Sequence, residues 1–115
     1  MAEATPSQTL RANWFHILVA LASSDMHGLA IARDVLDQTD GGLRLWPATL
    51  YRTLNDMVRA GLIAPLERSD EGEEEAGRRR YYTVTPKGKA ELSAAAERMV
   101  SFASTAQERL REASS

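Results

Sequence analysis

The positions of the hydrophobic residues predict three helices in the N-terminal half of the chain. In each stretch apolar residues recur at steps of three and four, the spacing of one buried helix face. Ser7 is the expected N-cap of the first helix, and the second helix begins at Gly28 and stops before Asp40. The third helix has Pro47 in its first turn and ends at Gly61. The inner face of the first helix is Leu10, Trp14, Ile17, Leu18 and Leu21, and that of the third is Leu50, Leu54, Met57 and Val58. The second helix carries the apolar residues Leu29, Ile31, Ala32, Val35 and Leu36.

A β-hairpin is predicted after the third helix. Residues 62–66 and 80–84 read as its strands, and Pro65 indicates that the first of them lies at an edge of the sheet. The charged, glycine-containing residues 67–77 between them are expected to form an exposed tip. Before the third helix, residues 43–46 alternate apolar and polar side chains briefly, which predicts a bridge or short strand.

A long helix is predicted to close the chain, with Thr85 as its N-cap and Pro86 at its first position. Its apolar side chains alternate steps of four and three over almost three heptads and form a seam, which consists of Leu92, Ala96, Met99, Ala103, Ala106 and Leu110. A domain of 115 residues has a thin core, and no later element remains to cover this seam. We therefore expect a second copy of the chain to cover it in a homodimer.

Three helices followed by a hairpin are the element order of a winged helix-turn-helix. The predicted fold class is therefore mainly α with a small β-hairpin, in which the second and third helices form the reading pair. Residues 1–9 are the N-terminal lead and the start of the first helix, and residues 10–84 form the winged helix-turn-helix with a wing at about 62–84. Residues 85–112 form the C-terminal dimerisation helix. A symmetric dimer suits inverted-repeat DNA, because its two reading helices then address half-sites roughly 34–36 Å apart.

Composition narrows the class of protein. The chain is 43% hydrophobic and 26% charged, an ordinary balance for a globular domain. The absence of cysteine excludes disulfide scaffolds, thiol nucleophiles and Cys-based metal sites. The longest strongly apolar stretch, residues 15–22, is too short to span a bilayer, so we expect a cytoplasmic protein. His16 is expected to be partly buried and His27 to start a helix; with no metal, no cofactor and no activated nucleophile indicated, we expect no enzyme.

Charge is distributed unevenly along the chain. The net charge is −2, but residues 67–75 hold six acids and one arginine. The rest of the chain has 13 basic and 10 acidic residues, so any anion-binding face is local.

The chain resembles the PadR-like transcriptional regulators over about residues 10–112. The motifs that carry the resemblance are MHG at 26–28, TLYRTL at 49–54, AGLI at 60–63 and RYYTVTPKG at 80–88. The length is similar to that of the short subgroup, whose single C-terminal helix serves dimerisation. The resemblance implies a repressor that releases DNA when a small molecule or stress signal is sensed. Two residues depart from the family pattern, Leu29 where an aromatic residue is frequent and Arg52 where proline is frequent.

The candidate DNA contacts lie on the third helix and the wing. Thr49, Arg52 and Thr53 are the expected base contacts, Asn55 suits adenine, and the Tyr51 hydroxyl is placed to reach a phosphate. Asp56 is expected to face solvent or form a salt bridge. The wing offers three cations to the phosphate backbone, namely Arg78, Arg79 and Arg80. An ordinary solvated helix face, and ion pairs between these arginines and residues 71–75, are the alternative interpretations.

Large apolar side chains indicate where an effector would bind. Trp14, Trp46, Met99 and Phe102 are the best candidates for a cavity lining. Resemblance to the family implies that a flat, hydrophobic or aromatic effector binds between subunits, among Trp14, Met99 and Phe102. The alternative is that these residues only form the dimer core.

A second function class stays open on sequence grounds. A winged-helix domain whose acidic wing contacts a basic protein partner would show little sequence-specific DNA binding.

Overall fold

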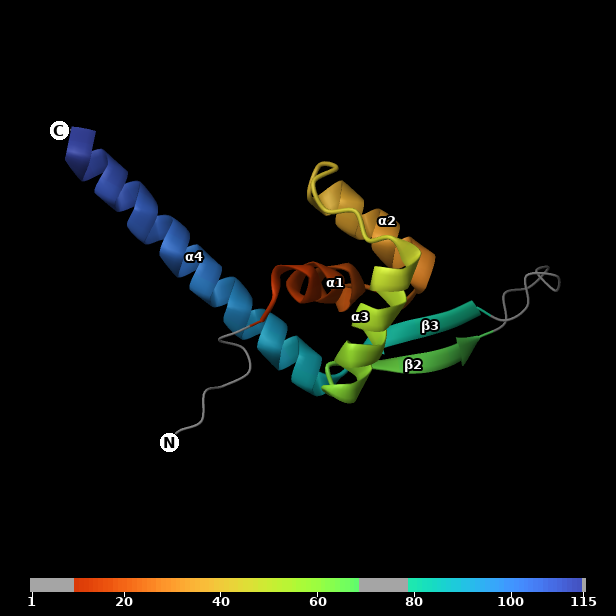
Figure 1. Cartoon of the computed structure of the whole chain (residues 1–115). Coiled ribbons are helices and arrows are strands. Elements are labelled where there is room, and N and C mark those ends of the chain that lie inside the picture. The colour runs from red at the N-terminus through yellow and green to blue at the C-terminus, as the bar shows by residue number, and fades with distance from the viewer. Residues whose placement is uncertain (1–9, 69–78, 115) are drawn as a thin grey trace.

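The computed structural model describes residues 10–68 and 79–114. Its elements, in chain order, are α1 (Ala12–Ala22), β1 (Met26–His27), α2 (Gly28–Gln38), α3 (Pro47–Arg59), β2 (Ile63–Arg68), β3 (Arg79–Val84) and α4 (Pro86–Ser114). Helices α1, α2 and α3 pack beside a small sheet, and α4 leads away from this body (Figure 1). The mainly helical fold with a small sheet is the predicted one.

The three strands form one antiparallel sheet in the order β1-β3-β2. Pro65 lies opposite Tyr82 on the edge strand β2, which confirms the predicted edge position. The strand predicted at residues 43–46 is wrong, because these residues are irregular and β1 takes the free edge of β3 instead. Leu45 is buried in the core while its neighbours in sequence are exposed, so the alternation reflects burial of one side chain without strand pairing.

Helix α1 begins later than predicted. Its N-cap is Arg11, with extended backbone (φ −73°, ψ 154°), whereas Ser7, the predicted cap, lies outside the described residues. Leu10, just before the cap, packs against the core and lines the same depression as Phe15 in the first turns of α1. An apolar residue before the cap that packs on the following turn fixes the direction in which the chain enters the helix.

The end of α3 and the start of α4 are joined by hydrogen bonds. Gly61 has a φ of +82°, and its amide and the next one donate to carbonyls of the last turn of α3 at 3.0 Å each. This is the predicted glycine stop. Thr85 Oγ1 accepts from the Gly88 amide at 3.0 Å and donates to the Gly61 carbonyl at 2.6 Å, so the predicted cap also anchors α4 to α3.

The core lies between the first three helices and the sheet. Its fully buried side chains are Ile17, Leu18, Leu21, Ile31, Val35, Leu50, Leu54, Met57 and Ile63. His16 is partly buried, as predicted: its Nδ1 donates to Oε1 of Gln38 at 2.7 Å, and Gln38 Nε2 donates to the His16 carbonyl at 2.9 Å. This reciprocal pair ties α1 to α2.

Only the first part of α4 packs against the rest of the described structure. Leu92 packs on the core and Ala95 is buried, whereas residues 99–114 are all exposed. The C-terminal half of the helix therefore projects from the body, as Figure 1 shows. Within the two described ranges, no helix is both long and apolar enough to cross a membrane.

Candidate nucleic-acid interface

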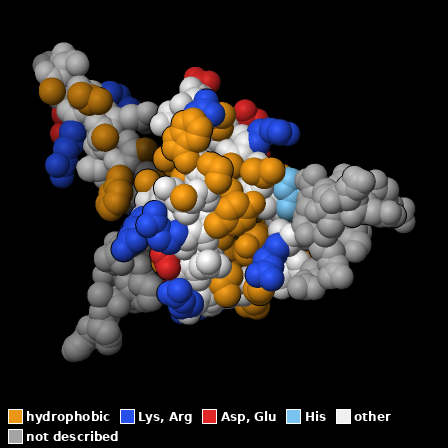
Figure 2. Space-filling view, turned by 45° about the vertical axis from the view of Figure 1, so that its right-hand side comes forward, with side chains coloured by type: hydrophobic (Ala, Val, Ile, Leu, Met, Phe, Trp, Pro, Cys, Tyr) orange, Lys and Arg blue, Asp and Glu red, His pale blue; other side chains and the backbone are white. Residues whose placement is uncertain are grey.

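One face of α3 is exposed and polar. Thr49, Arg52 and Asn55 lie on it at a spacing of three residues, while the opposite face is buried in the core. Pro47 occupies the first helical position, where its missing N–H leaves no backbone donor unpaired, so it favours the start of α3 at this residue. On the view in Figure 2, hydrophobic side chains form a central band with lysine and arginine side chains around it. The exposed face of α3 therefore offers hydrogen-bonding groups and a cation to a partner.

Thr53 lies on the other side of α3, which corrects its predicted place among the base contacts. It is only 7% exposed. Residues 50, 53, 54 and 57 share the inner face of the helix, because steps of three and four keep the same side. Thr53 therefore contributes to the core, and the small hydroxyl-bearing residue that remains on the outer face is Thr49.

Tyr51 covers the start of α2. A Cβ on Gly28 would lie 2.7 Å from its hydroxyl oxygen and 2.8–2.9 Å from two ring carbons, so glycine is needed for this close packing. The Tyr51 side chain is nevertheless 42% exposed. His27 caps α2 by accepting from the Ala30 amide through Nδ1 at 3.2 Å, as predicted for a residue at a helix start. The ring of Tyr51 thus lies against the start of α2 while part of its surface stays accessible.

On the wing, the structure describes one cationic side chain. Arg80 is exposed on β3, opposite Glu67 of β2. Arg79 begins β3, and its side chain is not described. Arg78 and the predicted pairing partners at 71–75 lie outside the described residues. On α3, Asp56 faces Arg59 at 3.6 Å, the salt bridge that the sequence predicted as one alternative.

The Tyr82 side chain itself is not available for binding. Tyr82 is buried near Arg80 and Tyr51, and burial raises the pKa of its phenol, although the nearby Arg80 lowers it in part. This tyrosine therefore supports the packing of the wing on the helices and stays neutral.

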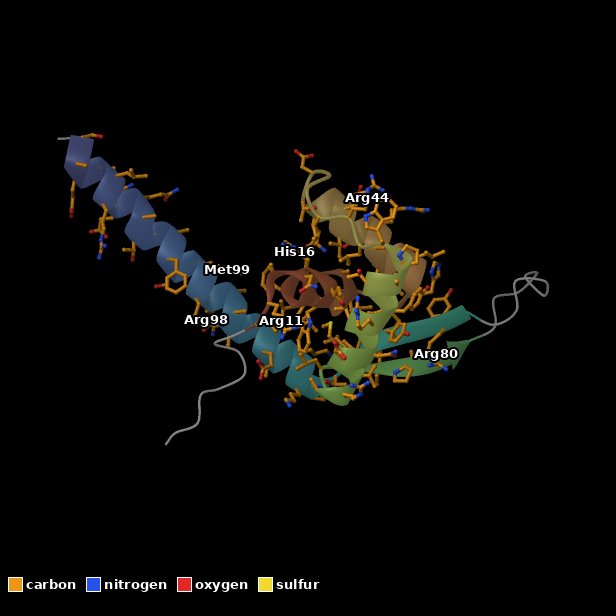
Figure 3. The ribbon with its side chains drawn as sticks, in the orientation of Figure 1. Arg11, His16, Arg44, Arg80, Arg98 and Met99 are labelled. Carbon is orange, nitrogen blue, oxygen red and sulfur yellow. The ribbon has the colours of Figure 1, made fainter. Side chains whose placement is uncertain are left out.

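Trp46 is the largest departure from the sequence prediction. It was expected to line a cavity, but 63% of it is exposed and it forms the N-cap residue of α3. The Arg44 guanidinium lies over its ring, 5.2 Å from the centroid. Figure 3 shows Arg44 at the end of the molecule formed by α2 and the loop that leads to α3. No periodic pattern in the sequence marked this pair, because residues 43–46 belong to no regular element.

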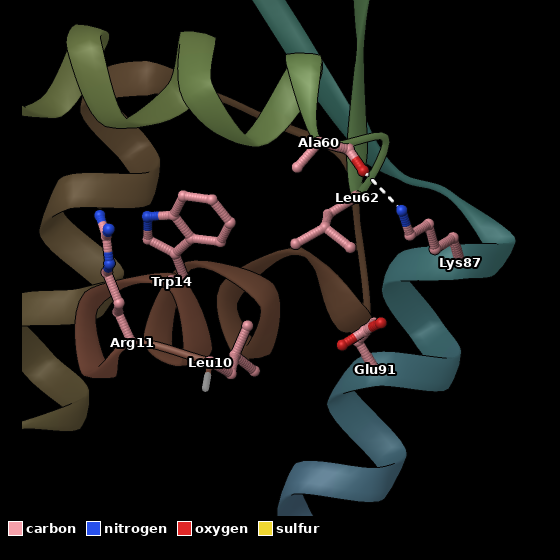
Figure 4. A pocket seen from close by; sticks show the side chains of 7 residues that line it. All are labelled: Leu10, Arg11, Trp14, Ala60, Leu62, Lys87 and Glu91. Atoms are coloured by element: carbon pink, nitrogen blue, oxygen red, sulfur yellow. Dashed lines mark hydrogen bonds between the residues drawn. The ribbon is translucent and has the colours of Figure 1, made fainter. Parts of the chain in front are cut away.

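The predicted effector residues are divided between two depressions. Met99 and Phe102 line one of about 240 Å³ between α1 and α4, together with Phe15. Trp14 lines another of about 240 Å³ with Leu62 and residues of α4 (Figure 4). Within one chain, therefore, Trp14 does not share a site with Met99 and Phe102.

The Trp14 depression contains an unpaired acceptor. Glu91 Oε1 is buried and has no hydrogen-bond partner among the residues that the structure describes. Lys87, one turn earlier on α4, donates instead to the Ala60 carbonyl at 2.9 Å, as the dashed line in Figure 4 marks. Arg11 lies 5.5 Å from the centroid of the Trp14 ring. A ring, two cations and an unsatisfied carboxylate oxygen thus line one small hollow.

The chain is similar to known transcriptional regulators. The family model described as "Transcriptional regulator PadR-like family" matches residues 17–94. The transcriptional regulator Rv3488 of Mycobacterium tuberculosis is 33% identical over 78 residues, which are 68% of this chain and 66% of that protein, just under two thirds of its length.

Solved structures share the fold. A PadR family transcription regulator from Clostridium difficile R20291 matches with a TM-score of 0.67 and 24% identity, over 84% of this chain and 98% of that one. Bacillus subtilis PadR in complex with operator DNA matches with a TM-score of 0.62 and 20% identity, over 73% of this chain and 46% of that one.

Proposed function

Because the chain belongs to the PadR-like family of transcriptional regulators, we propose that it binds a DNA operator as a homodimer and represses transcription. The observation that carries this proposal is the exposed face of α3, with Thr49, Arg52 and Asn55 in a row. Bacillus subtilis PadR, which shares the fold, was solved with operator DNA. Membership of this family agrees with the prediction that the chain is not an enzyme.

The proposed contacts follow from side-chain chemistry. Arg52 suits the two acceptors of a guanine edge, Asn55 suits adenine, and Thr49 suits a thymine methyl or a phosphate. The exposed Arg80 of the wing and the Tyr51 hydroxyl are proposed to contact the phosphate backbone, with Arg78 and Arg79 as further proposed wing contacts. Phosphate contacts set the position of the protein on the duplex, and the α3 residues select the sequence.

The homodimer is proposed on the exposed seam of α4. Met99 and Leu110 of the seam, and Val100 and Phe102 beside it, are between 48% and 70% exposed, which is unusual for so many large apolar residues on one helix. Helix α4 has 29 residues, and its outer half projects beyond the body. The small seam residues Ala103 and Ala106 let a second helix approach closely. Pairing of two such helices would hold two α3 helices at a fixed separation, as an inverted repeat requires.

Release by a small aromatic effector is proposed at the dimer interface. Both hollows lie between α1 and α4, so a molecule bound in either would bias the angle between the dimer helix and the DNA-binding body. Glu91 Oε1 would accept a hydrogen bond from a donor on that molecule, beside the Trp14 ring. Compounds that change neither operator affinity nor Trp14 fluorescence would speak against this part of the proposal.

The test is selection of bound sequences from a random duplex pool, at low and at near-physiological salt. Enrichment of an inverted repeat with half-sites about one helical turn apart is the expected result. Binding that enriches no sequence and disappears as salt rises would overturn the proposal, because only non-specific electrostatics would remain. That outcome would favour the acidic-wing interaction module instead.

Arg52→Ala refines this test. It should weaken operator binding by about 1–3 kcal/mol per half-site and relax the preference at one base position. Arg59→Ala is the matched control, because Arg59 is on the same helix but at its far end and faces Asp56. If the two substitutions weakened operator binding equally, the proposal that the first turns of α3 contact the bases would be contradicted.

A further inference from the structure

Trp46 and Arg44 stand at the end of α3 that would enter the groove. Reading helices of this fold class present their N-terminal residues to the bases. Trp46 is the residue directly before Pro47, and its exposed ring therefore lies close to Thr49 along the chain at that same end. A tryptophan that is 63% exposed leaves a large apolar area and an N–H donor in contact with solvent.

The segment that carries this pair is held firmly. Leu45, between the two residues, is 7% exposed and belongs to the core cluster. Its burial directs the flanking side chains outward, where both Arg44 and Trp46 are exposed. The Arg44 guanidinium lies over the Trp46 ring, 5.2 Å from its centroid, a cation–π contact that leaves its N–H donors available for a ligand. The pair is thus pre-organised for a ligand outside the protein.

A second arginine borders the same hollow as Arg44. Arg33 of α2 lines one shallow depression with Arg44 and Leu45, while α2 also carries Asp34 and Asp37. The carboxylate of α3 that pairs with an arginine, Asp56, lies towards the other end of that helix. A partner that fits here carries anionic groups spaced around an apolar or flat surface, which describes the sugar–phosphate backbone of a duplex.

We infer that Trp46 and Arg44 form a backbone clamp, in which the indole packs on a deoxyribose and donates through Nε1 to a phosphate that the Arg44 guanidinium also binds. The inference rests on the proposed function and adds contacts that hold α3 in register at its reading end. Since the contacts are to sugar and phosphate, they strengthen binding to every sequence and do not select bases.

Tryptophan fluorescence tests whether the surface formed by Trp46 and Arg44 contacts DNA. Trp14→Phe leaves Trp46 as the sole tryptophan, and Trp46→Phe leaves Trp14 as the sole one. Titration with the duplex recovered by selection should change the emission of the Trp14→Phe protein and leave that of the Trp46→Phe protein nearly constant. Identical responses of the two proteins would overturn the inference.

Affinities test the chemistry of each group. Trp46→Ala should weaken binding about tenfold on the selected duplex and on an unrelated duplex alike, the size expected for one charge-assisted hydrogen bond. Arg44→Ala should also reduce the salt slope by about 0.9 for each phosphate that the guanidinium neutralises in the wild type. Arg44→Lys keeps the charge but removes the planar, multi-donor guanidinium, and it should recover only part of the affinity.

Arg109→Ala, on the outer half of α4, is the control for removal of a positive charge. If the wild-type protein selects an operator and both Trp46→Ala and Arg44→Ala bind it as tightly as the wild type, the clamp is overturned and the proposed function stays intact. A wild-type protein that selects no duplex overturns both.

Discussion

Gly88 is the position at which the structure predicts the sharpest effect on stability. It is buried in the first turn of α4, where a Cβ would overlap the Leu62 carbonyl oxygen and lie 2.8 Å from Val84 Cγ2. Real Cβ atoms essentially never approach other atoms within 3.0 Å, so Gly88→Ala must displace the backbone at Leu62. That carbonyl accepts the Thr85 amide at 3.0 Å, and the displacement would strain this bond as well.

The magnitude follows from three contributions. Overpacking of a filled core costs about 1–3 kcal/mol, and loss of one backbone hydrogen bond costs about 1 kcal/mol. Alanine recovers about 1 kcal/mol because it is the better helix former. Gly88→Ala should therefore reduce the free energy of unfolding by about 1–3 kcal/mol, which corresponds to a fall in Tm of roughly 4–12 °C.

Thermal and urea unfolding at one fixed protein concentration measure this change, since dimerisation would make Tm depend on concentration. Gly28→Ala is the matched control: the added Cβ there meets only the exposed end of the Tyr51 side chain, which is free to rotate away. A free energy of unfolding for Gly88→Ala within about 0.5 kcal/mol of the wild-type value would refute the predicted overlap, because surface substitutions stay within about that range. A loss of stability no larger than that of Gly28→Ala would refute it as well.

Three further predictions concern binding, pH and assembly. Gly28→Ala should keep the fold yet displace Tyr51, weakening operator affinity in a binding titration about fivefold if its hydroxyl contacts a phosphate; unchanged affinity would exclude that contact. Burial raises the pKa of Tyr82 above its ordinary value of 10.0, so the folded state holds the phenol proton more strongly than the unfolded state does. The free energy of unfolding therefore keeps its full value below about pH 10 and decreases as the pH rises above that value. Tyr82→Phe should therefore flatten the alkaline loss of stability in urea unfolding, and an unaltered slope would contradict this. Met99→Glu places a charge on the exposed seam and should shift sedimentation toward the monomer, whereas Ser101→Glu, off the seam, should not.

Local chemistry made several boundaries predictable. Gly61 ends α3 and Thr85 with Pro86 opens α4, as expected, because each motif satisfies backbone groups within a few residues of itself. Pro65 indicated the edge strand for the same reason, since a proline has no amide to offer a second neighbour.

The outward face of α3 was predicted only in part. Thr49, Arg52 and Asn55 are exposed as expected, but Thr53 is not, because a polar residue at a helical step of three or four from core leucines turns inward with them. The exposure of Trp46 was missed because a tryptophan in an irregular segment has no period from which to infer its direction.

The sequence by itself determined the helices, the hairpin and the seam of α4, because these depend on periodicity and on capping over a few neighbouring residues. Only the tertiary structure decided which side chains stay outside. Burial of Leu45 turns Arg44 and Trp46 outward, the packing of Tyr51 on Gly28 closes the start of α2, and β1 completes a sheet that no local alternation indicated. Those outcomes depend on contacts between residues far apart in the chain, and such contacts form only when the whole core closes.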